Sequence, residues 1–323
     1  PHPPEGAALR KAGLHRPCGL HRLLCRHPCL PAGVPELLKE ENTIMAETRA
    51  KKVRSRLITT LIVGLFACLF VLPLVWMILT SFKSTNEVFG TTNWLPSKWH
   101  WSNYAEVWTN PQLSMAKCYW NSILIVVIGT AGQLIVSSMA AYAFAKIDFK
   151  GKKFVFTLFL ASIMIPSQVT IIPRFMLFYK MGIYNTLWSI ILPSWFGATS
   201  IFLLRQFYMG LPNDLIEAAK IDGAGHLRIF AQIMLPLTKP VMVSCIVLSF
   251  IALWNEYLSP LIFLTNKKVY TIAQAIRWYL MSDTQQYELT MAAASIAIVP
   301  LIILFVFCQK YFVEGIATSG MKG

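Results

Sequence analysis

The sequence GLPNDLIEAAKIDGAGHLRIFAQIMLPLTKP, residues 210–240, is a polar stretch between two strongly apolar segments. Its first half predicts a short helix. Pro212 and Asn213 are typical of a helix start, and an acidic residue such as Glu217 suits the positive end of the helix dipole. Gly223 and Gly225 are expected to end this helix, because glycine is common at the C-terminal ends of helices.

The second half of this stretch predicts another short helix, from His226 to about Met234, which ends before Pro236 and Pro240. One side of it is apolar, with Leu227, Ile229, Phe230, Ile233 and Met234. Each helix has about ten residues, and isolated helices shorter than about 12–15 residues are marginal in water. We therefore expect a helix-turn-helix hairpin that is held either by the lipid interface or by a partner protein.

The composition indicates an integral membrane protein. Apolar residues make up 55% of the chain and charged residues only 14%, whereas soluble domains carry roughly 25% charged residues. The formal net charge of +14 could suggest nucleic acid. However, the basic residues lie beside apolar runs, where they set membrane orientation and contact anionic lipid. We expect a membrane protein with no nucleic-acid partner.

Six apolar runs are long enough to cross a membrane, because a helix rises about 1.5 Å per residue and the hydrocarbon core is about 30 Å thick. These expected spans are residues 57–79, 122–145, 154–173, 187–204, 241–264 and 291–307. Pro166 should kink the third span, which should be packed in protein. The expected fold class is an all-α integral membrane protein with six transmembrane helices and a cytoplasmic helix hairpin.

The distribution of Lys and Arg predicts the orientation. The side that holds the N-terminal basic cluster, the loop after Lys146 and the hairpin carries about twice as many Lys and Arg as the other side, and the richer side is cytoplasmic. We therefore expect a multi-pass protein of the bacterial cytoplasmic membrane, with both termini and the hairpin in the cytoplasm.

Glu256 is the one carboxylate inside an otherwise apolar span. A charge near the bilayer centre costs about 2.5–3.5 kcal/mol on insertion scales, so it calls for a functional or structural reason. Together with Trp254, Asn255 and Tyr257 it combines hydrogen-bonding groups with rings, a mixture that suits a polyhydroxylated ligand. Hydrogen bonds to neighbouring helices are an equally open interpretation.

Residues 210–240 resemble the signature loop of the membrane-spanning subunits of ATP-binding-cassette (ABC) importers, which reads E-A-A-x3-G-x9-I-x-L-P. Every fixed position is filled, by Glu217, Ala218, Ala219, Gly223, Ile233, Leu235 and Pro236. The resemblance implies that these residues, together with Asp222, form a pair of coupling helices that sit in a cleft of a cytoplasmic ATPase subunit. The small alanines permit close approach, and Glu217 can meet a cation on the partner.

Residues 57–323 are similar more widely to the second permease of maltose-type carbohydrate importers. The similar segments are 164–169, which contains Gln168, 202–207, 254–257 and 309–315. Where many relatives read Trp-Asn-Asp-Phe, this chain reads Trp-Asn-Glu-Tyr at 254–257, which keeps an acid and a ring. We take these four residues and Gln168 as candidates for the substrate path.

The resemblance also implies partners and a substrate. They are a second permease that forms a heterodimer with this one, two ABC ATPase subunits, an extracytoplasmic solute-binding protein and a transported sugar or oligosaccharide. Two alternatives remain open. The substrate could be another polyol such as glycerol phosphate, or the chain could be a six-span secondary transporter, which would need ion-coupling charges in several spans.

No enzymatic machinery is visible in the sequence. It contains no G-x-x-x-x-G-K-S/T phosphate loop, so ATP hydrolysis is expected from a partner, and we expect no cofactor and no catalytic residue. The N-terminal cysteines and histidines match no zinc spacing, and the remaining cysteines do not form a disulfide framework. We therefore expect the functional site to transmit a conformational change rather than to catalyse a reaction.

Residues 1–44 differ in composition from the rest and lack the apolar core of a secretory signal. We expect them to be translated upstream sequence without a fixed structure, with Met45 as the native start. Residues 45–323 would then be the permease domain, with the coupling loop at 210–240. N-terminal sequencing of the native protein tests this expectation, and a peptide that reads through Leu30 would contradict it.

Overall fold

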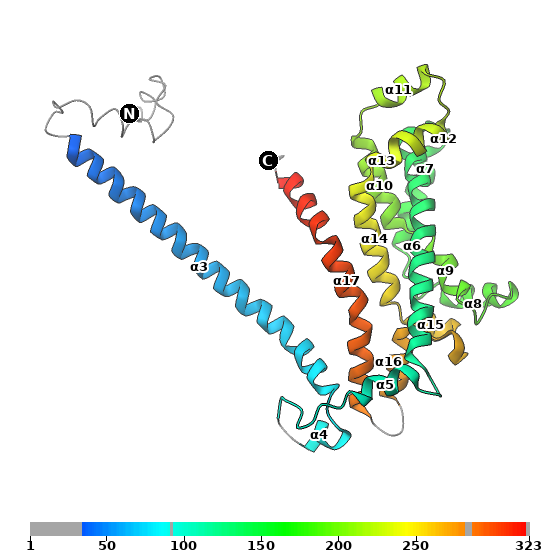
Figure 1. Cartoon of the computed structure of the whole chain (residues 1–323). Coiled ribbons are helices and arrows are strands. Elements are labelled where there is room, and N and C mark those ends of the chain that lie inside the picture. Colours follow the sequence, from blue (N-terminus) through cyan, green and yellow to red (C-terminus); the bar gives the residue numbers. More distant parts are fainter. Residues whose placement is uncertain (1–33, 91–92, 282–285, 321–323) are drawn as a thin grey trace. The chain divides into compact units, whose positions relative to one another are not determined.

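The computed structural model describes residues 34–90, 93–281 and 286–320. All regular secondary structure in these ranges is helical (Figure 1). The chain divides into two compact units, Pro1–Leu72 and Pro73–Gly323. The expected all-α class is therefore confirmed for the described residues.

The first unit is dominated by helix α3, Val34–Thr80, which continues into the second unit. The part of α3 from Arg54 to Thr80 is apolar and long enough to cross a membrane, and it contains the expected first span. The expectation that residues 1–44 lack a fixed structure is wrong for 34–44, which are helical. Pro35 and Glu36 favour a helix start there. Residues 1–33 lie outside the described residues, as do their cysteines and histidines.

The second unit is built around helix α6, Met115–Lys146. Helices α10, Ala198–Gly210, and α14, Lys239–Trp254, pack against α6, and helix α17, Tyr287–Gly320, packs against α14. Ala141, Leu204 and Cys245 are fully buried where α6, α10 and α14 meet. These helices form the body of the unit (Figure 1).

Shorter helices complete the second unit. They are α4, Thr85–Gly90; α5, Ser102–Thr109; α7, Lys152–Ile163; α8, Ile171–Lys180; α9, Trp188–Ser194; α15, Leu258–Phe263; the 3₁₀ turn η2, Lys267–Val269; and α16, Ile272–Leu280. The hairpin contains α11, Asp214–Ile221; α12, His226–Ile229; the π-helical turn η1, Phe230–Met234; and α13, Leu235–Leu237. The hairpin lies at one end of the unit, and α5 and α16 lie at the other (Figure 1).

Four stretches within the described residues are helical, long and apolar enough to cross a membrane, namely Arg54–Thr80, Met115–Lys146, Trp188–Gly210 and Tyr287–Gln309. A fifth consists of His226–Leu237 and Lys239–Trp254, which meet at an angle of 79°. These contain the expected first, second, fourth and sixth spans and most of the fifth. The fifth expected span breaks after Trp254, as its polar residues suggested, and resumes as α15.

The third expected span, 154–173, is not one helix. Helix α7 ends at Ile163 and α8 begins at Ile171, so Pro166 lies in a break rather than in a kinked helix. A proline has no N–H and its ring clashes with the preceding turn, which explains why the helix stops there. Within the second unit, residues 161–169 are exposed, so the expected packing of this segment does not come from the described part of this chain.

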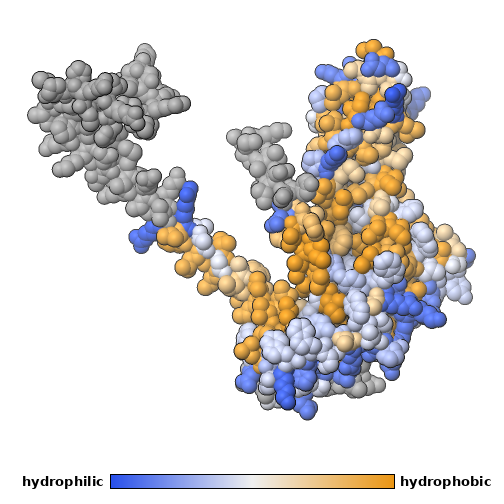
Figure 2. All heavy atoms as spheres, viewed as in Figure 1, coloured by the Kyte–Doolittle hydropathy of each residue, from blue (hydrophilic) through white to orange (hydrophobic). Residues whose placement is uncertain are grey.

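The unit surface separates apolar from polar residues. Figure 2 shows apolar side chains over the helical body and polar side chains at the end that holds α5 and α16. Large exposed apolar residues include Phe154 and Leu158 on α7 and Leu248 on α14. Apolar surface of this extent is typical of a protein that contacts lipid or other subunits.

Helix α6 lies close to the end of α9 where Gly132 faces Trp195, the residue after α9. A Cβ on Gly132 would lie 2.1 Å from Nε1 of Trp195. The same indole nitrogen donates a hydrogen bond of 3.3 Å to the carbonyl of Ile128. Only glycine leaves room for the ring at this position.

Candidate functional site

The predicted hairpin is present, with α11 as its first arm and α12, η1 and α13 as its second. The turn between the arms depends on Gly223, whose φ of +78° lies in the left-handed region. Gly225, by contrast, has a φ of −74° and begins the second arm in an extended conformation. Gly223 is therefore the glycine that this turn requires.

The outer face of the hairpin carries most of the signature residues of its first arm. Glu217, Ala218 and Asp222 are exposed, as is Gly223. Ala219 is instead buried, at 8% exposure, and packs in the core of the unit. The signature treats the two alanines alike, but in the structure Ala218 is exposed and Ala219 faces the core.

Two large apolar side chains flank this face. Ile221 is 86% exposed and Leu227 is 76% exposed, and they stand on either side of the turn at Gly223. Exposed apolar residues at the tip of a polar loop are unfavourable in water unless another surface covers them. The hairpin therefore presents a mixed surface of acidic, small and apolar residues.

The expected apolar stripe of the second arm is partly wrong. Leu227 points away from the core, while Ile229 and Met234 are completely buried, and Ile233 and Leu235 are half-buried. A π-helical turn at 230–234 explains the change. It inserts an extra residue per turn and so shifts the face on which later residues lie. Pro236 is exposed and sits within α13 rather than ending the arm.

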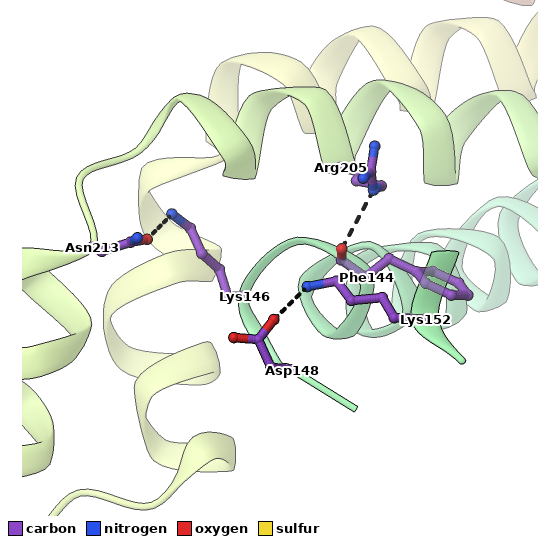
Figure 3. Close-up of polar contacts among 6 residues, drawn as sticks. All are labelled: Phe144, Lys146, Asp148, Lys152, Arg205 and Asn213. Carbon is purple, nitrogen blue, oxygen red and sulfur yellow. Dashed lines mark hydrogen bonds and ion pairs between the residues drawn. The ribbon is translucent and has the colours of Figure 1, made fainter. Parts of the chain in front are cut away.

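The base of the hairpin is tied to the end of α6 by Lys146. Its Nζ donates to the carbonyl of Leu211 at 2.7 Å. It also donates to Oδ1 of Asn213 at 2.6 Å (Figure 3). Asn213 was expected to cap α11, but its side chain makes no capping hydrogen bond and accepts from Lys146 instead. This contact could not be predicted from the sequence, because Lys146 and Asn213 are 67 residues apart.

A second link joins α10 to α6 and α7 in the same region. Nε of Arg205 donates to the carbonyl of Phe144 at 3.4 Å (Figure 3). Its guanidinium carbon lies 4.0 Å from the ring centre of Phe156 on α7. The only salt bridge among the described residues is also here, between Lys152 and Asp148 at 3.2 Å. These contacts brace the helix ends that carry the hairpin.

A third link connects α6 with the second arm. The hydroxyl of Tyr142 lies 3.1 Å from Nδ1 of His226, and the Tyr142 ring also contacts Phe230. In the sequence, no other histidine and no tyrosine lies within ten residues of His226. A residue pair so far apart in the chain could not be found from sequence spacing.

The residues proposed for the substrate path have different surroundings. Trp254 is 4% exposed, and its Nε1 donates to the carbonyl of Ala297 at 2.9 Å. Asn255 is exposed, but its amide donates back to Ile251 of its own helix at 2.9 Å. The Trp254 contact joins α14 to α17, as expected if the segment holds helices together, whereas the Asn255 contact stays at the end of α14.

Glu256 has both a structural contact and access to a cavity. Its Oε1 accepts from the backbone N–H of Ser259 at 2.8 Å, at the start of α15. The residue also lines a cavity of about 190 Å³ together with Arg174, a cation that sequence reasoning had not linked to it. The same cavity is lined by the hydroxyl groups of Ser167, Ser189, Ser194 and Ser259. Gln168, next to Ser167, is exposed.

A second cavity, of about 460 Å³, lies between α6, α10 and α14. Its polar lining residues are Gln133, Ser194, Thr199, Ser200 and Ser249. Gln133 donates to Ser200 at 3.0 Å, while the buried hydroxyl of Ser249 has no partner within the described residues. The two cavities share Ser194 and Leu253 as lining residues, so they are neighbours along the helices.

Comparisons with known proteins agree with this arrangement. Residues 133–318 match the family described as "Binding-protein-dependent transport system inner membrane component". The arabinooligosaccharides transport system permease protein AraQ of Halalkalibacterium halodurans is 35% identical over 80% of this chain and 93% of its own length. The melibiose/raffinose/stachyose import permease protein MelC of Bacillus subtilis is 30% identical over 85% of this chain and 100% of its own length.

The fold also has a solved counterpart. It is similar to a chain in the crystal structure of a bacterial ABC transporter involved in the import of the acidic polysaccharide alginate, with a TM-score of 0.72 and 22% identity. The similarity covers 82% of this chain and 98% of the other. This chain therefore belongs to the family of binding-protein-dependent transport system inner membrane components, and it is a multi-pass ABC transporter permease rather than an enzyme.

Proposed function

We propose that this chain is one membrane-spanning subunit of an ATP-driven importer that carries a sugar or oligosaccharide across the bacterial cytoplasmic membrane. The hairpin carries the argument. It combines the full signature spacing with an exposed face of Glu217, Ala218 and Asp222, bordered by exposed Ile221 and Leu227. A membrane-embedded transporter that worked alone would have no use for such a surface, and family membership removes the secondary-transporter alternative.

The partner for this face is a cytoplasmic ATPase subunit. Glu217 and Asp222 offer carboxylates to cations, and Ile221 and Leu227 offer apolar area to a cleft. Closure of two ATPases on nucleotide would move the hairpin, and Lys146, Tyr142 and Arg205 would pass this motion to the spans. A second, different permease and a solute-binding protein would complete the importer.

The proposed topology has six crossings, with the hairpin and both termini in the cytoplasm. Five crossings correspond to the four long apolar helices and to α14, the part of the bent pair that lies outside the hairpin. The remaining crossing would consist of α7, the break at 164–170 and α8. Irregular backbone at membrane depth is tolerated only when protein covers it or water lines it. We therefore expect the second permease to cover the exposed break between α7 and α8.

The proposed substrate route follows the two neighbouring cavities. A polyhydroxylated molecule would replace its hydrogen bonds to water with hydrogen bonds to the protein. Glu256 and Arg174 would supply them in one cavity, and the hydroxyl groups around Ser249 in the other. The names of similar permeases include arabinooligosaccharides and melibiose, raffinose and stachyose, which supports a sugar. One relative, 34% identical over 64% of this chain, is an sn-glycerol-3-phosphate transport system permease, so a polyol phosphate is the second candidate.

Substitution of Gly223 tests the coupling role. Valine at this position, G223V, would place a β-branched residue at positive φ, which costs about 1–2 kcal/mol and distorts the turn. No atom of the described chain lies within 4 Å of the added Cβ, so within this chain the effect comes from the backbone. We expect membrane insertion to persist and both sugar uptake and transport-stimulated ATPase activity to be lost when the chain is co-expressed with its partner subunits.

Gly225 supplies the matched control. It also has no atom within 4 Å of an added Cβ, but its φ of −74° suits any residue. G225V should therefore keep most of the uptake. Normal uptake in G223V, or equal loss in both variants, would contradict the coupling role of this turn.

A further inference from the structure

A third cavity, of about 440 Å³, lies in the second unit at the end that holds α16. Its lining residues are Gln112, Leu261, Lys267, Tyr270, Gln274, Arg277, Trp278 and Met281. In Figure 1, α16 lies at the opposite end of this unit from α11. The volume is within the range of about 300–1,000 Å³ that is typical of small-molecule sites. Neither the hairpin nor the proposed substrate route uses this cavity.

The cavity is positively charged. Lys267 and Arg277 line it, and none of its lining residues is acidic. The Lys267 ammonium lies 4.9 Å from the ring centre of Trp278, and the Arg277 guanidinium lies 5.8 Å from the ring centre of Tyr257. Neither cation forms a salt bridge in the part of the chain that the structure describes. Nε of Arg277 also donates to Sδ of Met281 at 3.2 Å. None of these contacts neutralises the positive charge, which stays available to an anion.

The walls add groups that suit a sugar ring. Tyr270 and Trp278 present aromatic surface with a polar hydroxyl or N–H, and Gln112 adds a side-chain amide. Rings of this kind pack against the C–H faces of a saccharide, and the amide can bond its hydroxyls. An extended acidic peptide would not need a ring-lined cavity of this volume, and a neutral sugar would not need two cations.

Buried hydrogen bonds hold the cavity in shape from the side of α6. The Asn121 amide donates to the carbonyl of Lys268 at 3.0 Å and to that of Tyr270 at 2.9 Å. Ser122 accepts from the backbone N–H of Ile272 at 2.9 Å. The segment that carries Lys267 and Tyr270 is therefore fixed to α6.

Two residues of α16 hold the other walls. The Gln274 amide donates to the carbonyls of Pro260 and Leu264 at 3.0 and 3.1 Å. The Tyr279 hydroxyl contacts the carbonyls of Val107 and Leu113 at 3.2 and 3.0 Å, next to Gln112 in the chain. A site formed before its ligand arrives loses less entropy on binding.

We infer that this cavity binds one saccharide unit that carries an anionic group, either a carboxylate or a phosphate. The anion would lie between Lys267 and Arg277, and the ring would pack against Tyr270 and Trp278. This inference rests on the proposed transport function and adds to it a charge preference at the end opposite the hairpin. Its failure would leave the result of the Gly223 experiment unchanged, so the two can be distinguished.

Saturation-transfer NMR on the purified full chain in phosphatidylcholine nanodiscs tests the inference. The probes are glucuronate, glucose 6-phosphate and glucose, each titrated to a dissociation constant. We expect at least one anionic probe to bind about tenfold more tightly than glucose, since one charge-assisted hydrogen bond has about this effect. The stronger of the two shows whether the preferred group is a carboxylate or a phosphate. The preference should shrink as salt is added.

Variants of Arg277 and Lys267 show whether the cavity is responsible. R277Q and K267Q should each remove most of the preference for the anion and leave glucose binding unchanged, while R277K should keep part of it. K180Q, which alters an exposed lysine outside the cavity, is the control. Equal binding of glucose and both anions, or equal losses in K180Q and R277Q, would overturn the inference. Displacement of both anionic sugars by a short glutamate peptide that binds more tightly would overturn it in favour of a protein ligand.

Discussion

Lys146 donates a 2.6 Å hydrogen bond to Asn213 and thereby ties the last residue of α6 to the residue that precedes α11. The same ammonium holds the carbonyl of Leu211. Both bonds are partly exposed to solvent, so we expect them to contribute about 1–2 kcal/mol together. That is too little to determine the fold, but it is enough to decide how rigidly the hairpin follows α6.

Replacement of Lys146 by methionine should loosen the hairpin. K146M keeps most of the aliphatic stem and removes both hydrogen bonds, so amide hydrogen exchange in residues 211–221 should become several-fold faster. Sugar uptake should fall with it, while the amount of protein in the membrane stays constant. K150M is the control, because Lys150 is exposed and lies in the same basic loop. Unchanged exchange in K146M would show that Lys146 does not anchor the hairpin.

The contact between Gly132 and Trp195 makes a prediction about stability. G132A should force the indole away from α6 and break its bond to Ile128, at a cost of about 1–3 kcal/mol as in other overpacked cores. A thermal unfolding experiment in detergent should show a lower melting temperature. Gly210 offers the comparison, since no atom lies within 4 Å of its added Cβ. G210A should be neutral, and equal melting temperatures for the two variants would contradict the close approach.

Local features of the hairpin could be predicted from the sequence. Gly223 and Gly225 predict the end of the first helix, and α11 ends shortly before them. The sequence does not say which of the two adopts the left-handed conformation; in the structure it is Gly223, with a φ of +78°. The long apolar spans followed from hydropathy, which depends only on neighbouring residues. Which residues of the second arm face the core could not be predicted. The π-helical turn at 230–234 depends on packing against other helices, and the spacing of apolar residues does not reveal it.

Contacts between residues far apart in the chain could not be predicted from the sequence. Lys146 bonds to Asn213, 67 residues further along the chain. Arg174 shares a cavity with Glu256, although the two are also far apart in the sequence. The third span shows the same limit. Pro166 signalled a disturbance, but only the structure distinguishes a kink from a complete break between α7 and α8.

Tyr279 predicts a loss of stability at alkaline pH. Burial raises the pKa of its hydroxyl above the ordinary value of 10.0, and Cys118 and Glu106 add to the rise. A raised pKa in the folded state means that the stabilisation is fully present below pH 10 and is lost as the pH rises through the folded-state pKa. The melting temperature of the purified chain should therefore decline above about pH 10.

Y279F should weaken that decline, because it removes the ionising group. It should also lower the melting temperature at neutral pH, since the carbonyls of Val107 and Leu113 lose a buried donor, at a cost of about 1–3 kcal/mol. Y184F is the control, because the Tyr184 hydroxyl has no hydrogen-bond partner in the described ranges. An alkaline decline in Y279F as steep as in the wild type would show that other groups cause it.

Glu256 can be assigned to the substrate path or to helix packing by two substitutions. E256Q keeps an oxygen that can accept from Ser259, so α15 should begin normally, but it removes the charge that shares a cavity with Arg174. If the carboxylate meets the substrate, E256Q should raise the KM for uptake about tenfold or more, because a charge-assisted hydrogen bond is lost. E256A removes the acceptor as well and should also lower the melting temperature. Normal uptake in E256Q together with a destabilised E256A would assign Glu256 to the start of α15 alone, and the route would then have to depend on the hydroxyl groups around Ser194 and Ser249.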